Sequence, residues 1–178
     1  MKQIEILNLN EHSMISLKPF FDNRGSFCEM PVFKNFNVVQ ENVSVSRPGT
    51  IRGMHWQAGR YVQAKIVTCL YGDIIDVIVD IRPDSKTFKR VFCYTLGGKS
   101  GNYLYIPKGY AHGFINVGGT DAVFRYIVDN EYNKESERGF YYNSIEDFIW
   151  PKSAFGEVFV SDKDVALPSM NGIQDFTD

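Results

Sequence analysis

Between residues 64 and 119, short apolar runs alternate with compact turn sequences at intervals of about 10 to 15 residues. Residues 64–71 and 73–81 either alternate polar and apolar side chains or are continuously apolar, which is typical of strands. Turns rich in glycine or proline follow at 71–73, 82–85, 96–99 and 116–119. No window between residues 40 and 130 shows a helical period. The pattern predicts an all-β sandwich or barrel that hides its sheet edges.

The whole chain, residues 1–178, is interpreted as a single domain. Its 178 residues and 20.4 kDa suffice to bury a core without disulfides or a structural metal. No linker, internal repeat or low-complexity stretch divides it. We expect short helices at the two ends. The clearest candidate is residues 144–149, where Ser144 is an N-cap candidate and Asp147 occupies the third helical position.

Composition excludes several classes of function. The 19 Lys and Arg residues against 21 Asp and Glu give a net charge of -2, which argues against bulk phosphate neutralisation on a nucleic acid. No segment is apolar for long enough to cross a bilayer, and residues 1–13 lack the apolar centre of a signal peptide. Cys28, Cys69 and Cys93 are odd in number and unpaired in spacing, which predicts reduced, buried thiols. We therefore expect a cytoplasmic protein with neither a membrane nor a nucleic acid as partner.

Residues 101–116 have the spacing Gly101-x5-Pro107-x-Gly109-x2-His112-x3-Asn116. This describes a strand, a tight turn and a second strand that carries His112 inward. The spacing resembles the second sequence motif of the cupin superfamily, which implies a jelly-roll barrel with short flanking helices. His112 is either a core histidine bonded to the backbone or a substrate contact.

A cupin metal site is not expected in this chain. The first cupin motif normally supplies a His-x-His pair and a glutamate, whereas residues 52–57 supply His55 and place Gln57 at the second histidine position. A catalytic metal needs about three imidazole or carboxylate ligands. The third histidine, His12, lies in the N-terminal region. The histidines of the barrel are better suited to acid–base work.

Six sequence blocks resemble the dTDP-4-dehydrorhamnose 3,5-epimerase family in content and order: residues 22–29, 40–46, 52–57, 65–85, 106–114 and 132–139. The resemblance extends from about residue 20 to residue 168. It implies a cofactor-free isomerase that inverts C3, C5 or both in a nucleotide-linked 4-keto-6-deoxy sugar, with dTDP or GDP as the nucleotide. It also implies a homodimer in which a neighbouring subunit helps to hold the base, and a role in polysaccharide synthesis.

Inverting a carbon beside a ketone requires a base, a stabiliser for the enolate oxygen and an acid on the opposite face. His55 suits the base, because imidazole titrates near neutral pH. The resemblance selects Asp164, rather than Asp162, as the carboxylate that orients it. Lys65 would stabilise the enolate oxygen, and Tyr132 would return the proton.

Each of these catalytic candidates also has a structural interpretation. Lys65 could extend from a strand edge or pair with Asp76. Tyr132 is one of ten tyrosines and could serve packing alone. His55 could be a core histidine, and Asp164 could cap a helix or remain a surface charge.

Further residues suit a sugar nucleotide. Arg24 and Arg52 each precede a glycine, which allows a guanidinium to sit where backbone approaches a diphosphate closely. Their structural alternative is an ion pair with a strand carboxylate. The amide, carboxylate and imidazole groups expected to contact ribose, base or sugar belong to Glu29, Gln40, Asn42, Gln57 and His112.

Two rival functions remain open. One is a cupin ketoisomerase that moves the ketone from C4 to C3. The other is a metal-dependent cupin oxygenase or a binding-only cupin. The family often has a Tyr-Tyr pair where this chain has Glu131-Tyr132, and Trp-Asn-Asp where it has 142–144. These departures leave the sugar and the number of inverted centres open.

Overall fold

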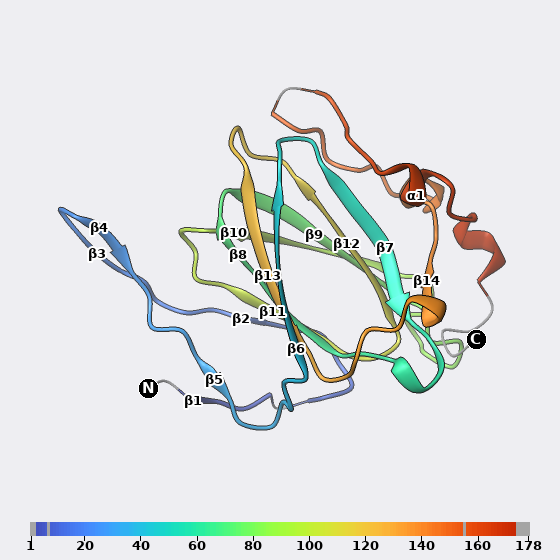
Figure 1. Cartoon of the computed structure of the whole chain (residues 1–178), viewed down its shortest axis with the longest axis horizontal. Coiled ribbons are helices and arrows are strands. Elements are labelled where there is room, and N and C mark those ends of the chain that lie inside the picture. The colour runs from blue at the N-terminus through green and yellow to red at the C-terminus, as the bar shows by residue number, and fades with distance from the viewer. Residues whose placement is uncertain (1–2, 7, 155, 174–178) are drawn as a thin grey trace.

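A computed structural model describes residues 3–6, 8–154 and 156–173. Two five-stranded antiparallel sheets face each other and form the barrel, as Figure 1 shows. The first has the order β10-β9-β12-β7-β14, with bounds Val91–Gly97, Asp73–Asp80, Tyr110–Asn116, Ile51–Gln57 and Glu137–Gly139. The second has the order β2-β11-β8-β13-β6, with bounds Ser13–Ile15, Tyr103–Ile106, Lys65–Tyr71, Ala122–Val128 and Gln40–Ser46. The predicted all-β jelly-roll is confirmed.

Short segments complete the fold. A two-stranded parallel pair joins β1 (Gln3–Ile4) to β5 (Val32–Phe33), and a hairpin joins β3 (Phe20–Asp22) to β4 (Gly25–Phe27). The hairpin projects away from the barrel at the left of Figure 1. The 3-10 turns are η1 (Gly59–Tyr61), η2 (Lys134–Ser136), η3 (Tyr142–Ser144) and η4 (Met170–Gly172), and one α-helical turn, α1, spans Asp162–Val165.

β9 carries apolar residues on both of its faces, because both faces of the strand are buried. Ile74 and Ile78 face the barrel interior, where they pack with Val67 of β8 and Leu104 of β11. Val77 faces the opposite way, toward the C-terminal segment that covers the first sheet. The N-terminal segment covers the outer face of the second sheet in the same manner. The barrel is thus wrapped by both ends of the chain, and its interior retains the polar side chains described below.

The helix predicted over residues 144–149 is wrong. A 3-10 turn ends at Ser144, and Ile145 turns into the core at 5% exposure. Asp147 has a φ of 57°, which a continuing α-helix does not permit. Within the described residues, the N-terminal end carries strands rather than a helix, and the α-helix lies instead at Asp162–Val165.

The prediction of buried thiols holds only in part. All three cysteines are free, but only Cys69 is buried, while Cys28 is half-buried and Cys93 is exposed. Cys93 lies on β10, the edge strand of the first sheet. The C-terminal segment that covers the centre of this sheet leaves the Cys93 position uncovered. In the described part of the chain, no helix is long and apolar enough to span a membrane.

Candidate active site

A pocket of about 330 Å³ opens into the barrel interior between the two sheets. It is centred on β7 and β12, where His55 and His112 are direct cross-strand neighbours. The second sheet contributes side chains from the opposite wall. The lining residues are Ser44, Arg52, His55, Lys65, His112, Gly113, Phe114, Phe124, Tyr126, Ser161, Lys163 and Asp164.

His55 and Asp164 form a hydrogen-bonded pair, with 2.8 Å between His55 Nε2 and Asp164 Oδ1. Ser161 caps the helical turn α1 by accepting from the Asp164 N–H, which fixes the carboxylate at the pocket wall. Burial by itself would raise the pKa of Asp164, but hydrogen bonds from His55 and from the Gly53 N–H outweigh it and lower the pKa. Asp164 is therefore an ionised acceptor that orients the imidazole. Within the described residues, Asp164 and not Asp162 forms the hydrogen bond to this ring.

Lys65 begins β8 and extends into the pocket from the wall facing His55. Desolvation by burial lowers the pKa of its ammonium to about 8, although Asp76 and Glu137 act in the opposite direction. No hydrogen bond or ion pair within the described residues engages its Nζ. The alternative pairing with Asp76 is not formed, because Asp76 Oδ2 lies 2.8 Å from His112 Nε2 instead.

Tyr132 is not among the residues that line this pocket. Its side chain is 50% exposed, and its hydroxyl donates to Glu137 Oε2 at 2.9 Å. The phenol that does line the pocket is Tyr126, on the inward face of β13. Burial raises the pKa of Tyr126. The sequence reasoning missed Tyr126, although the alternation of β13 contained a usable signal: Phe124 and Tyr126 share one face.

Gln40 and Asn42 lie on the same face of β6 as the pocket residue Ser44, because alternate residues of a strand point to one side. The Gln40 amide donates to Asn42 Oδ1 at 2.8 Å, and Asn42 is the cross-strand neighbour of Tyr126. This row extends the pocket along β6. Gln40 and Asn42 can therefore contact a part of a ligand that extends out of the pocket along β6.

Arg52 lines the pocket without a carboxylate partner in the described structure. Its Nε donates to Ser46 Oγ at 2.9 Å and its Nη2 to the Val45 carbonyl at 3.3 Å. Gln57 is placed differently, since it is buried and its Oε1 accepts from the Asn133 N–H outside the pocket. Arg52 thus leaves a positive charge available to a ligand, whereas Gln57 holds a loop.

The structure does not bring Arg24 or Glu29 to this pocket. Arg24 lies at the tip of the projecting β3–β4 hairpin, with its side chain 85% exposed and paired to Asp22 at 2.6 Å. That pairing matches its structural alternative. Glu29 follows the hairpin on an exposed stretch of chain.

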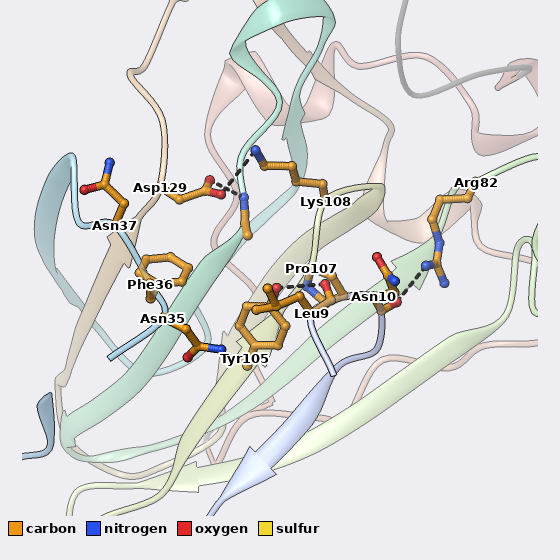
Figure 2. A pocket seen from close by; sticks show the side chains of 11 residues that line it. Leu9, Asn10, Asn35, Phe36, Asn37, Arg82, Tyr105, Pro107, Lys108 and Asp129 are labelled. Carbon is orange, nitrogen blue, oxygen red and sulfur yellow. Dashed lines mark hydrogen bonds and ion pairs between the residues drawn. The ribbon is translucent and has the colours of Figure 1, made fainter. Parts of the chain in front are cut away.

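A second hollow of about 570 Å³ lies between the N-terminal segment and the outside of the second sheet, as Figure 2 shows. Ala64 lines it, whereas the next residue, Lys65, lines the barrel pocket, so the sheet separates the two. Its charged groups are internally paired, with Lys108 Nζ 3.2 Å from Asp129 Oδ2. None of the predicted site residues lies in this hollow.

Comparisons with known proteins identify the family of this chain. Residues 6–172 match the profile of the family described as dTDP-4-dehydrorhamnose 3,5-epimerase. The chain is 38% identical over 157 residues to the dTDP-4-dehydrorhamnose 3,5-epimerase of Shigella flexneri, covering 83% of this chain and 84% of that protein. It is 34% identical to the protein of the same name in Escherichia coli K12, covering 92% and 93%.

Two crystal structures illustrate the structural similarity. A dTDP-6-deoxy-D-glucose-3,5-epimerase from Legionella pneumophila, in complex with dTDP-4-keto-L-rhamnose, has a TM-score of 0.83 at 34% identity, covering 92% of this chain and 89% of that one. A dTDP-4-dehydrorhamnose 3,5-epimerase from Bacillus anthracis, with TDP and PPi bound, has a TM-score of 0.83 at 35% identity, covering 93% and 97%.

Proposed function

This chain is an isomerase of the dTDP-4-dehydrorhamnose 3,5-epimerase family, and we propose that it inverts C3, C5 or both in a dTDP-linked 4-keto-6-deoxy sugar. One observation carries the proposal. An imidazole paired with a carboxylate, an ammonium whose N–H donors are free within the described residues, and a half-buried phenol line a single pocket. These are the groups that proton removal beside a ketone requires.

His55 is the proposed base. Its Nε2 is held by Asp164, and its Nδ1 forms no hydrogen bond within the described residues, so Nδ1 is available to accept a proton from carbon. Asp164 stays ionised and stabilises the imidazolium that forms when the proton is removed. The electron pair of the broken C–H bond moves into the carbonyl, which gives an enolate.

Lys65 is the proposed partner of the enolate oxygen. Because no protein group holds its ammonium, that ammonium can donate to the oxygen as negative charge develops there. Tyr126 is the proposed acid, in place of the Tyr132 expected from the sequence. It projects from β13, in the sheet opposite His55, and returns a proton to the other face of the carbon. Inversion results from removal and return on opposite faces.

A homodimer is the proposed state, with the β3–β4 hairpin of one subunit extending toward the site of the other. The hairpin carries Arg24 together with exposed phenylalanines at positions 20, 21 and 27, each more than 60% exposed. Several exposed aromatic side chains gathered on one projecting element favour burial against a partner. Arg24 would then meet the diphosphate beside Arg52. We expect the enzyme to act in the cytoplasm, where its free thiols stay reduced.

The direct test is incubation in D2O with dTDP-linked and, separately, GDP-linked 4-keto-6-deoxy sugars, followed by NMR. The proposal expects deuterium at C3, C5 or both of the dTDP sugar, together with inverted product. Movement of the ketone to C3 without inversion would establish the ketoisomerase instead. Exchange with the GDP sugar alone would correct the nucleotide. Nucleotide binding with no exchange would identify a binding module, and turnover that depends on added iron or manganese would identify an oxygenase.

A further inference from the structure

Asp76 of β9 is a buried carboxylate that the proposed mechanism does not use. Its side chain has 0% exposure, and it lies between Tyr94 and Phe114 in the strand register of the first sheet. One oxygen, Oδ2, is 2.8 Å from His112 Nε2. The other, Oδ1, has no hydrogen-bond partner within the described residues. A buried carboxylate with a free oxygen is costly unless positive charge lies nearby.

Lys65 supplies that neighbouring charge without making contact. Burial raises the pKa of Asp76 and lowers the pKa of Lys65, and the charge of each group opposes that shift in the other. No ion pair joins them, and the Asp76 carboxylate is bonded to His112 through Oδ2. Lys65 therefore keeps all three of its N–H donors for a ligand while a counter-charge remains within range.

The other ionisable groups around this pair do not replace Asp76. Glu137 also favours the charged form of Lys65, but it already has the Lys163 ammonium at 2.5 Å and the Tyr132 hydroxyl at 2.9 Å. Arg52, His55 and Tyr126 line the same pocket and are not carboxylates. Asp164 also lines it, but its carboxylate is bonded to His55 Nε2 and to the Gly53 N–H.

Three uncharged groups complete the surroundings of Asp76. Burial raises the pKa of Tyr94 on β10 and of the thiols of Cys69 and Cys93, so all three stay neutral near pH 7. Among the described residues, Asp76 is thus the carboxylate that acts on Lys65 and keeps one oxygen without a hydrogen-bond partner.

We propose that Asp76 is a positioning residue, which balances the Lys65 ammonium from a distance and keeps the ring hydrogen of His112 on Nε2. Lys65 thereby stays charged with its donors free, and His112 offers Nδ1 to the pocket. The catalytic meaning of this arrangement rests on the proposed function, because the ammonium is assigned there to the enolate oxygen. The charge relation itself belongs to the protein without ligand.

The first test is an NMR titration of the Lys65 Cε–Hε signal in ligand-free, ¹³C-labelled protein, assigned with Lys65→Met. In Asp76→Asn the titration midpoint of Lys65 should fall by roughly one unit or more, since the nearby negative charge is gone. Asp80→Asn is the matched control. Asp80 is an equally buried carboxylate on the same strand, bonded to Arg82, Ser85 and Thr87 rather than facing the pocket. An unchanged midpoint in folded Asp76→Asn overturns the proposal.

A measurement on the wild type decides the matter if Asp76→Asn does not fold. The ¹⁵N shifts of the neutral His112 ring should show the hydrogen on Nε2, and a hydrogen on Nδ1 contradicts the proposal. In the active enzyme, Asp76→Asn should move the basic limb of the pH–rate profile to lower pH. A uniform loss at every pH would indicate a merely structural role. If the wild type exchanges no sugar hydrogen, the proposed function fails, while the ligand-free titration still decides the role of Asp76.

Discussion

At the scale of single residues, the pocket separates the acid–base properties of its side chains by environment. Hydrogen bonds keep Asp164 ionised, burial lowers the pKa of Lys65 to about 8, and burial raises the pKa of Tyr126. A carboxylate, a weakened ammonium and a protonated phenol therefore coexist near neutral pH. This combination gives an orienting anion, a strong donor and a proton source in one cavity.

Replacing Tyr126 by Phe should abolish inversion while leaving hydrogen exchange. His55 still removes the proton in this variant, but no phenol returns one to the opposite face. We expect product formation to fall roughly 100- to 10,000-fold. Tyr132→Phe is the matched control and should lose less than about tenfold, since Tyr132 lies outside the pocket. Greater damage from Tyr132→Phe than from Tyr126→Phe would return the acid role to Tyr132.

Activity should decline as the pH rises through about 8. The folded-state pKa of Lys65 is lowered to about 8, so the ammonium is present below this pH and is lost above it. The pH profile of kcat/KM reports the pKa values of the free enzyme, so it should show this basic limb. Lys65→Arg retains its charge to much higher pH and should remove the limb from whatever activity remains. A wild-type profile that stays flat to pH 10 would disagree with the assignment.

At the scale of elements, Gly113 in β12 allows β7 to lie close to β12, so that His55 and His112 become cross-strand neighbours. A Cβ at Gly113 would lie 2.7 Å from the Arg52 carbonyl oxygen and 2.8 Å from Met54 Sδ. Gly113→Ala should therefore destabilise the protein by about 1–3 kcal/mol. Gly119→Ala, with nothing within 4 Å, should change stability by less than about 0.5 kcal/mol. Urea denaturation measures both, and equal values for the two variants would exclude this close approach.

Local sequence patterns predict the strands and turns well, but they do not predict where each element ends or which side chains face the pocket. Strand alternation and turn signals were strong enough to establish the barrel, because both determinants are local. The choice between Tyr126 and Tyr132 depends on which side chain points into the pocket near the end of β13. The two tyrosines are only six positions apart, and the local sequence does not show where the strand ends. The same applies to residues 144–149, where burial of Ile145 and the backbone at Asp147 outweigh a weak capping signal.

The pairing of His55 with a distant carboxylate shows the other limit. Asp164 is 109 residues from His55 in sequence, and only the resemblance to a family singled it out. The row formed by Gln40 and Asn42 could be predicted as one strand face, whereas the position of Arg24 could not. That arginine lies on the hairpin that projects from the barrel, and the local strand pattern does not give the direction of this hairpin.

At the scale of the whole molecule, the proposed active site is complete only when two chains form a dimer. The pocket contains the proposed base and acid, but Arg24 projects away on the hairpin. Light scattering should therefore report a dimer. Removing the aromatic side chains at 20, 21 and 27 should weaken it, because these side chains would lose their burial against the partner.

Subunit mixing tests whether the hairpin acts across the dimer. Arg24→Ala and His55→Asn should each be nearly inactive. After co-refolding, half of the dimers are mixed, and each mixed dimer has one site free of both changes, so roughly a quarter of wild-type activity should return. If Arg24 serves its own pocket, every site keeps one defect and no activity returns.

The most direct test of the whole account is the rate of solvent deuterium incorporation by His55→Asn. The asparagine keeps a polar side chain of similar position but has no basic nitrogen. With a dTDP-linked 4-keto-6-deoxy sugar in D2O, the account predicts loss of deuterium incorporation at both carbons beside the ketone, with the fold preserved by circular dichroism. Incorporation at the wild-type rate in this variant would contradict it.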